Sequence, residues 1–164
     1  MRKIIFFLLA ILFISCIKAV VKVTPDKKTI AEKYFRGIYG CDPSVVDRFA
    51  NDSISVSYPV FMRLFNKTEI KGKKSVKNFA SGFCSKWEEA QITIHDSILE
   101  ENKLVLFWSF NAKFVGESQL NGPEKNTEHA WGGISLFLFD DEGKILSEIG
   151  EESPDGMFYH LKNM

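Results

Sequence analysis

The sequence lacks most of the features that identify a protein's chemistry directly. It has only three cysteines and three histidines in 164 residues, and its 21 basic and 21 acidic residues balance to a net charge of 0. No histidines and acids recur at metal-ligand spacing, and no glycine-rich phosphate loop follows a strand-like segment. No basic stripe, internal repeat or low-complexity tract is present. We therefore expect no metal, no cofactor and no nucleic-acid partner.

A short apolar run is present at the start of the chain. Arg2 and Lys3 precede a short apolar segment, which predicts a signal peptide or lipoprotein leader over residues 1–19. The segment is too short for a comfortable membrane span, although an uncleaved anchor remains an alternative. Cleavage before Val20 would give a secreted or periplasmic protein. Alternatively, "LFISC" resembles a lipoprotein box, and a lipid on Cys16 would then be the protein's contact with the membrane.

Removal of the leader leaves about 145 residues, the size of one domain with a proper core. Residues 20–27 form a linker and residues 28–164 the domain. The leader carries three basic residues and no acid, so its loss shifts the net charge to about −3. Cys41 and Cys84 remain; they form a disulfide in an oxidising compartment, or Cys84 stays a buried free thiol.

The domain begins with helices. Thr29 is a suitable N-cap for a helix that ends near Tyr39, and residues 42–49 form a second, short helix capped by Asp42. A strand follows up to Pro59, then a loop or irregular crossover up to Gly72. A longer helix starts near Lys73, and its apolar stripe recurs at three- and four-residue spacing: Val76, Phe79, Ala80, Phe83 and Trp87.

The rest of the chain predicts strands joined by hairpins, over residues 91–99, 103–115, 127–139 and 144–152. Helices followed by a meander of strands indicate an α+β domain. The second and third of these strands are apolar on both faces, so neither face of the sheet can be fully exposed to solvent. We expect one face to cover the helices and the other to pair with a second copy in a homodimer.

Several motifs in this order resemble the SnoaL-like, polyketide cyclase-like branch of the nuclear transport factor 2-like superfamily. They are "IKGKKSVKNF" before the hairpins, Trp108 within a strand that Gly116 follows, and "GGISLFLFDDEGKIL" across the last turn. The resemblance covers roughly residues 28–163. It implies a cone-shaped, strongly bent antiparallel sheet wrapped around N-terminal helices, a cystatin-like fold with a cavity at its open end.

In this family the cavity holds small hydrophobic molecules, and enzymes among its members use acids there to move protons. The sequence departs from the cyclase pattern at the third strand, where Phe114 replaces a histidine, and on the last strand, where Ile149 replaces a tryptophan. The weak catalytic candidates that remain are His129, Glu151, Glu152 and Asp155. The candidate ligand-binding residues are Tyr58, Trp108, Phe114 and Trp131.

Three functions follow from these observations. The first is an exported, dimeric domain that binds a small hydrophobic ligand without turnover, because the proton-transfer positions are not clearly kept. The second is an enzyme of the cyclase, isomerase or epoxide hydrolase kind that uses cavity carboxylates with His129. The third is a dimeric partner-binding domain that works through the outer face of its sheet.

Overall fold

The computed structural model describes residues 25–117 and 123–153 of the chain. Its helices are α1 (Lys27–Tyr39), α2 (Ser44–Phe49), α3 (Pro59–Phe65) and α4 (Lys73–Cys84). Its strands are β1 (Ala50–Ser57), β2 (Ile70–Lys71), β3 (Trp87–Glu100), β4 (Lys103–Phe114), β5 (Glu128–Phe139) and β6 (Ile145–Ser153). The leader, Cys16 and Asp155 lie outside the described residues.

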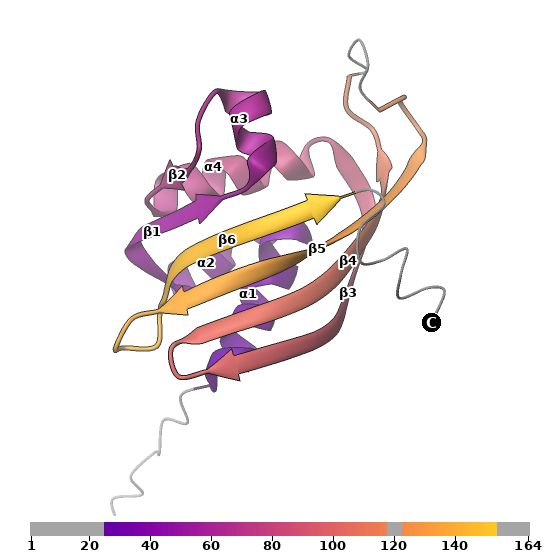
Figure 1. Ribbon diagram of the computed structural model, residues 1–164. Helices are drawn as coiled ribbons and strands as arrows, with labels where there is room; N and C mark the ends of the chain where they lie inside the picture. Colours follow the sequence, from indigo (N-terminus) through magenta and orange to yellow (C-terminus); the bar gives the residue numbers. More distant parts are fainter. Residues whose placement is uncertain (1–24, 118–122, 154–164) are drawn as a thin grey trace, which may run out of the picture.

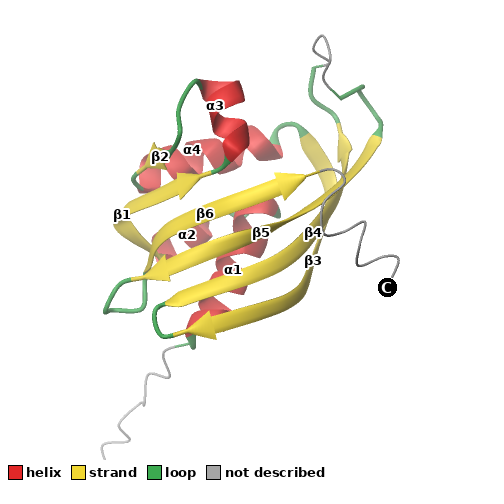
Figure 2. Ribbon diagram, in the orientation of Figure 1, coloured by secondary structure: helices red, strands yellow, loops and turns green. Residues whose placement is uncertain are grey.

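The strands form one curled, open sheet in the order β2-β1-β6-β5-β4-β3. All neighbours are antiparallel except β1 and β6, which run parallel. Figure 1 shows α1, α2 and α4 behind the sheet, with its other face uncovered by any helix, and Figure 2 shows the same division by element type. The predicted α+β fold, a strongly bent sheet around N-terminal helices, is confirmed.

The core lies between α1 and the concave face of the sheet. One face of β4 is buried along its whole length, through Leu104, Leu106, Trp108, Phe110, Ala112 and Phe114. It meets the apolar side of α1, where Phe35 and Trp108 bring their ring centroids to 5.1 Å. Burial of large apolar side chains on both elements is the main force that holds the helix on the sheet.

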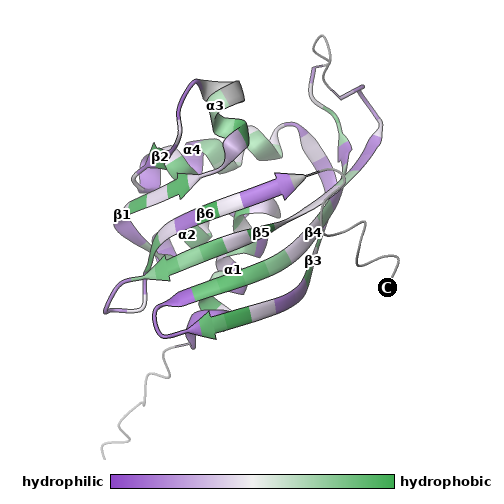
Figure 3. Ribbon diagram, viewed as in Figure 1, coloured by the Kyte–Doolittle hydropathy of each residue, from purple (hydrophilic) through white to green (hydrophobic). Residues whose placement is uncertain are grey.

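The opposite face of the sheet is also apolar. Ile98, Val105, Leu136 and Ile149 occupy directly paired positions and form a row across β3, β4, β5 and β6. Ile98 and Ile149 are 57% and 46% exposed. Figure 3 shows the apolar colouring that follows β4 and β5 toward the β3–β4 turn.

Two predicted helix starts were wrong by one or more residues. Asp26, not Thr29, caps α1: its Oδ1 accepts from the backbone N–H of Thr29 at 2.9 Å. Pro43 occupies the N-cap position of α2, and the Asp42 carboxylate accepts from the N–H of Ser44 at 3.1 Å. In both places an acidic side chain satisfies a free N–H group of the first turn.

The segment predicted as an irregular crossover contains helix α3 and the short strand β2. Pro59 stands in the first turn of α3, where its missing N–H costs nothing. Asn66 ends that helix in the left-handed conformation. β2 then pairs with β1 through Ile70 and Lys71. Within the described residues no helix is long and apolar enough to cross a membrane.

Cys41 and Cys84 form a disulfide, so the free-thiol alternative was wrong. It joins the turn after α1 to the last residue of α4, across 43 positions of sequence, with the Cα atoms 5.6 Å apart. The disulfide therefore fixes the end of α4 beside the core helix.

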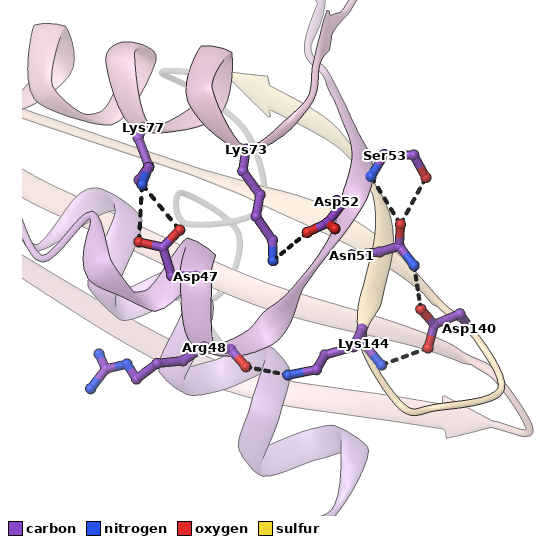
Figure 4. Close-up of polar contacts among 9 residues, drawn as sticks. All are labelled: Asp47, Arg48, Asn51, Asp52, Ser53, Lys73, Lys77, Asp140 and Lys144. Atoms are coloured by element: carbon purple, nitrogen blue, oxygen red, sulfur yellow. Dashed lines mark hydrogen bonds and ion pairs between the residues drawn. The ribbon is translucent and has the colours of Figure 1, made fainter.

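Polar contacts tie the start of β1 to its surroundings (Figure 4). Lys77 of α4 lies 3.0 Å from both carboxylate oxygens of Asp47 in α2. The Asn51 amide donates to Oδ2 of Asp140 at 2.6 Å, and the backbone N–H of Lys144 donates to the other oxygen of that carboxylate at 2.8 Å. Such surface contacts add little stability individually, but they fix how α2, β1 and the β5–β6 turn meet.

Candidate functional site

A cavity of about 770 Å³ lies beside α4, where the bent ends of the long strands curl over that helix. Eight of its eighteen lining residues are aromatic. The rings that line it are Tyr39, Tyr58, Phe61, Phe79, Phe83, Trp87, Phe114 and Trp131. A cavity of this size with an apolar wall can enclose a small organic molecule.

The two ends of the cavity differ in exposure. Phe61, Tyr58 and Tyr39 are 0%, 3% and 9% exposed, so they form the inner end. The exposed residues among the lining, Gly82 and Lys86 for example, mark the mouth. A ligand would therefore pass from a polar rim into an aromatic interior.

A buried carboxyl group lies directly behind the inner end. Glu148 of β6 has no exposed surface. Its Oε1 lies 2.6 Å from the hydroxyl of Tyr58 and 3.4 Å from that of Tyr39. Its Oε2 and the buried hydroxyl of Tyr34 have no hydrogen-bond partner among the described residues. One oxygen of the carboxyl group therefore accepts hydrogen bonds and the other does not. Tyr39 and Tyr58, which line the cavity, separate the carboxyl group from it.

The hydrogen bonds around Tyr58 form a chain with one direction. The Trp108 indole can only donate, and it donates to Oγ of Ser135 at 2.9 Å. The hydrogen of Ser135 is then available to the Tyr58 oxygen, 2.8 Å away. The hydrogen of Tyr58 points in turn at Oε1 of Glu148. Three donors in sequence therefore support negative charge on the carboxyl group.

Burial opposes that charge. Loss of water raises the pKa of Glu148 from 4.5 to about 7, against the lowering effect of the hydrogen bonds from Tyr58 and Tyr39. Burial and the nearby carboxylate raise the pKa of both tyrosines well above its usual value, so both hydroxyls keep their protons. Glu148 therefore changes charge near neutral pH.

Gly150 makes room for this arrangement. It lies two residues after Glu148 on the same face of β6, and a Cβ atom there would overlap the Tyr58 ring. The ring packs onto the bare backbone of the strand, which brings its hydroxyl to the carboxyl group. A glycine permits such close approach.

The structure brings four of the eight sequence candidates to the cavity wall. Tyr58, Phe114, Trp131 and Glu152 line it. Trp108 does not; its ring is buried behind the wall and its N–H is bonded to Ser135.

The remaining candidates lie elsewhere. His129 shares the inner face of β5 with Trp131 but stands outside the lining, with its Nε2 2.7 Å from Oγ1 of Thr127. Glu151 is exposed and pairs with Ile134 on the outer side of the sheet. Asp155 is beyond the described residues. The structure therefore does not bring His129 and Glu151 together at the cavity.

Sequence reasoning missed Glu148 because the strand reverses its alternation. The pairing of β5 with β6 shifts register at Leu138 and Phe139. Ile145 faces inward, yet Glu148 also faces inward and Ile149 faces outward. An apolar/polar pattern assigns the opposite orientation to these last two residues. No cluster of three or more potential metal ligands occurs in the described parts of the chain.

Comparison with known proteins identifies the family. A model of the SnoaL-like domain matches residues 31–148, most of the chain. The protein belongs to the SnoaL-like domain family. A search of curated proteins found no match.

Solved structures share the fold at low identity. A protein of Shewanella denitrificans described as a SnoaL-like polyketide cyclase is 16% identical, with a TM-score of 0.66 over 86% of this chain and 100% of its own. A protein of Streptomyces galilaeus described as a hydroxylase is 14% identical, with a TM-score of 0.62 over 84% and 85%. A ketosteroid isomerase-like protein of Catenulispora acidiphila, solved with trimethylamine, is 12% identical, with a TM-score of 0.57 over 74% and 82%.

Proposed function

We propose that this SnoaL-like domain binds a small molecule with an apolar body in the cavity beside α4. The observation that carries the proposal is the aromatic wall of this open-mouthed cavity, which ends at the buried Tyr39 and Tyr58. Burial of apolar ligand surface against such rings supplies affinity, and the tyrosine hydroxyls supply the few polar groups that orient a ligand.

Gly82 offers a direct test, because it lines the cavity and nothing lies within 4 Å of a Cβ built there. The neutral dye Nile red should bind the unmodified protein and Gly82→Ala with saturable fluorescence at one dye per chain. Gly82→Trp should weaken binding at least tenfold, because the indole occupies the cavity. Equal binding to all three proteins would place the dye elsewhere and overturn the proposal.

A proton-transfer enzyme is the second candidate, and Glu148 favours it. A general acid or base works best with a pKa near the working pH, and burial places this one at about 7. Tyr58 is the contact through which Glu148 could act on a ligand in the cavity. Exchange of the acidic C–H hydrogens of 2-tetralone in D₂O tests this. Catalysed exchange lost in Glu148→Gln supports an enzyme, and exchange at the uncatalysed rate with unmodified protein rejects it.

We also infer that the domain is exported and dimeric. The apolar leader and the Cys41–Cys84 disulfide support an oxidising compartment outside the cytoplasm. The apolar row from Ile98 to Ile149 supports pairing of two sheets face to face. Light scattering should give the mass of two chains for the unmodified protein and the mass of one chain for Ile149→Lys. The control Met62→Lys, which changes an exposed residue of α3, should keep the mass of two chains. A monomeric unmodified protein would exclude the dimer.

A further inference from the structure

We propose that the ligand of this cavity is an organic cation, an ammonium group on an apolar body, and that its charge lies at the inner end beside Tyr39 and Tyr58. This inference rests on the proposed function of the cavity and adds the chemical class of the ligand. It is carried by the distribution of charge around the inner end and by the aromatic wall.

In the part of the chain that the structure describes, the charged side chain at the inner end is the acidic Glu148, and other acidic residues line the cavity. Glu148 lies behind the two tyrosines, and Glu152, four residues further along β6, lines the cavity itself. Glu117 lines the exposed side. The cationic lining residue is Lys86, which is exposed at the mouth. The carboxylate form of Glu148 attracts a positive charge at the inner end and repels an anion there.

No cationic side chain in the described parts of the chain compensates Glu148. The groups that face it are the Tyr34 and Tyr39 hydroxyls from α1 and the Tyr58 hydroxyl from the end of β1. None of them carries a positive charge. A cation that pairs with a buried carboxylate stabilises its charged form, and no such partner lies among the residues that the structure describes.

The wall suits a weakly hydrated cation. The face of an aromatic ring carries partial negative charge and attracts ammonium groups, most strongly for tryptophan. Beside Tyr39 at the inner end lie the rings of Phe79 and Phe83, with centroids 6.4 Å and 5.3 Å from its own, and Trp87 continues the surface 6.1 Å from Phe83. Alkylated ammonium groups lose little hydration when they contact such rings, so the apolar wall and the acidic inner end favour the same ligand.

The proposal couples ligand binding to the protonation of Glu148. A nearby cation favours the carboxylate, so it should lower the pKa of Glu148 and release a proton on binding. Because that pKa lies near 7 without ligand, affinity for a cation should rise with pH through neutrality. If binding lowers the pKa by one unit, affinity should increase about tenfold between pH 5 and pH 9.

Two probes of the same shape separate charge from apolar contact. Benzyl(2-hydroxyethyl)dimethylammonium carries a permanent charge, and 3,3-dimethyl-4-phenylbutan-1-ol replaces its nitrogen with carbon. Neither probe titrates over this pH range. Calorimetric titrations should show the pH-dependent rise for the ammonium probe and no rise for the alcohol. In Glu148→Gln the rise should disappear, and in Glu151→Gln, which changes an exposed residue on the other face of β6, it should remain.

Proton release provides a measurement that does not depend on any variant. Titration of the unmodified protein with the ammonium probe at pH 7, in buffers of different ionisation enthalpy, should show release of a fraction of a proton per site. The cation proposal is overturned if the alcohol binds and the ammonium probe does not, or if the ammonium probe binds with no dependence on pH and no proton release. Failure of both probes to bind would instead overturn the cavity as a ligand site.

Discussion

The hydroxyl of Tyr58 lies 2.6 Å from Oε1 of Glu148, and this contact joins the cavity wall to the one fully buried charged side chain among the described residues. It results from a bare stretch of β6 at Gly150 and from a strand register that turns a glutamate toward the helices. The site's response to pH depends on this pair of residues, because the Tyr58 hydroxyl donates to the carboxyl group whose pKa is about 7.

Glu148 should make the protein less stable as pH rises. Its pKa is about 7 in the folded protein and 4.5 when exposed, so folding favours the protonated form. The stabilisation is complete below pH 4.5 and is lost as pH rises through 7, by about 3 kcal/mol. Urea unfolding of Glu148→Gln, relative to unmodified protein, should lack this fall between pH 4.5 and pH 7.5. Parallel pH profiles would show that Glu148 does not titrate in this range.

Tyr58 and Tyr34, two of the three buried tyrosines of the core, should respond differently to loss of their hydroxyls. Tyr58→Phe removes hydrogen bonds to Glu148 and Ser135 and should cost about 1–3 kcal/mol of stability. Tyr34→Phe removes a hydroxyl with no hydrogen-bond partner among the described residues, so it should be neutral or stabilising. Denaturant unfolding measures both; equal losses would contradict the hydrogen-bond assignment.

Two glycine substitutions test the packing of Tyr58 on β6. In Gly150→Ala the new methyl group overlaps the Tyr58 ring, and the forced shift should cost about 1–3 kcal/mol. Gly82→Ala meets open space within α4 and should stabilise the protein by about 0.5–1 kcal/mol. The melting temperature should therefore fall in Gly150→Ala and rise in Gly82→Ala. A harmless Gly150→Ala would mean that Tyr58 does not pack where the structure places it.

The disulfide should contribute strongly to stability. It closes a loop of roughly 44 residues, and the loss of chain entropy in the unfolded state corresponds to about 4 kcal/mol. Dithiothreitol should lower the melting temperature of the unmodified protein. It should have no effect on the double variant Cys41→Ser, Cys84→Ser, which serves as the control. An unchanged melting temperature in both proteins would contradict the pairing.

Sequence alone predicted the parts of the fold that rest on long, regular patterns. The apolar stripe that begins at Val76 identified α4, and the runs that follow identified the paired strands. The last predicted member of that stripe, Trp87, was wrong, because it is the first residue of β3. The exact first residue of a helix was harder to predict where two nearby residues could each act as its N-cap. Asp26 and Thr29 are both good capping residues, and only the position of the α1 backbone decides between them. Pro59 was the available signal for α3, but that helix has only seven residues.

The candidate site was only partly predictable, for a physical reason. The side of a strand on which a residue lies depends on every register shift before it. The shift at Leu138 and Phe139 places Glu148 inside and Ile149 outside. Hydropathy alone predicts the opposite orientation for these two residues. The glutamate is buried because Tyr58 and Tyr39 hydrogen-bond to it and the surrounding core packs around it, and neither contribution can be read from the glutamate itself. Tyr58 and Trp131 were found because aromatic residues suit either a core or a cavity wall.

The indole N–H signals of the three tryptophans offer the most direct test of the cavity as a ligand site. Trp87 and Trp131 line the cavity, whereas Trp108 is bonded to Ser135 behind the wall. The signals can be assigned in a nitrogen–proton correlation spectrum with single Trp→Phe variants. An apolar ligand should shift the indole signals of Trp87 and Trp131, and the shifts should saturate at one molecule per chain. The signal of Trp108 should move least. Saturating binding that leaves the Trp87 and Trp131 signals unchanged would contradict the account.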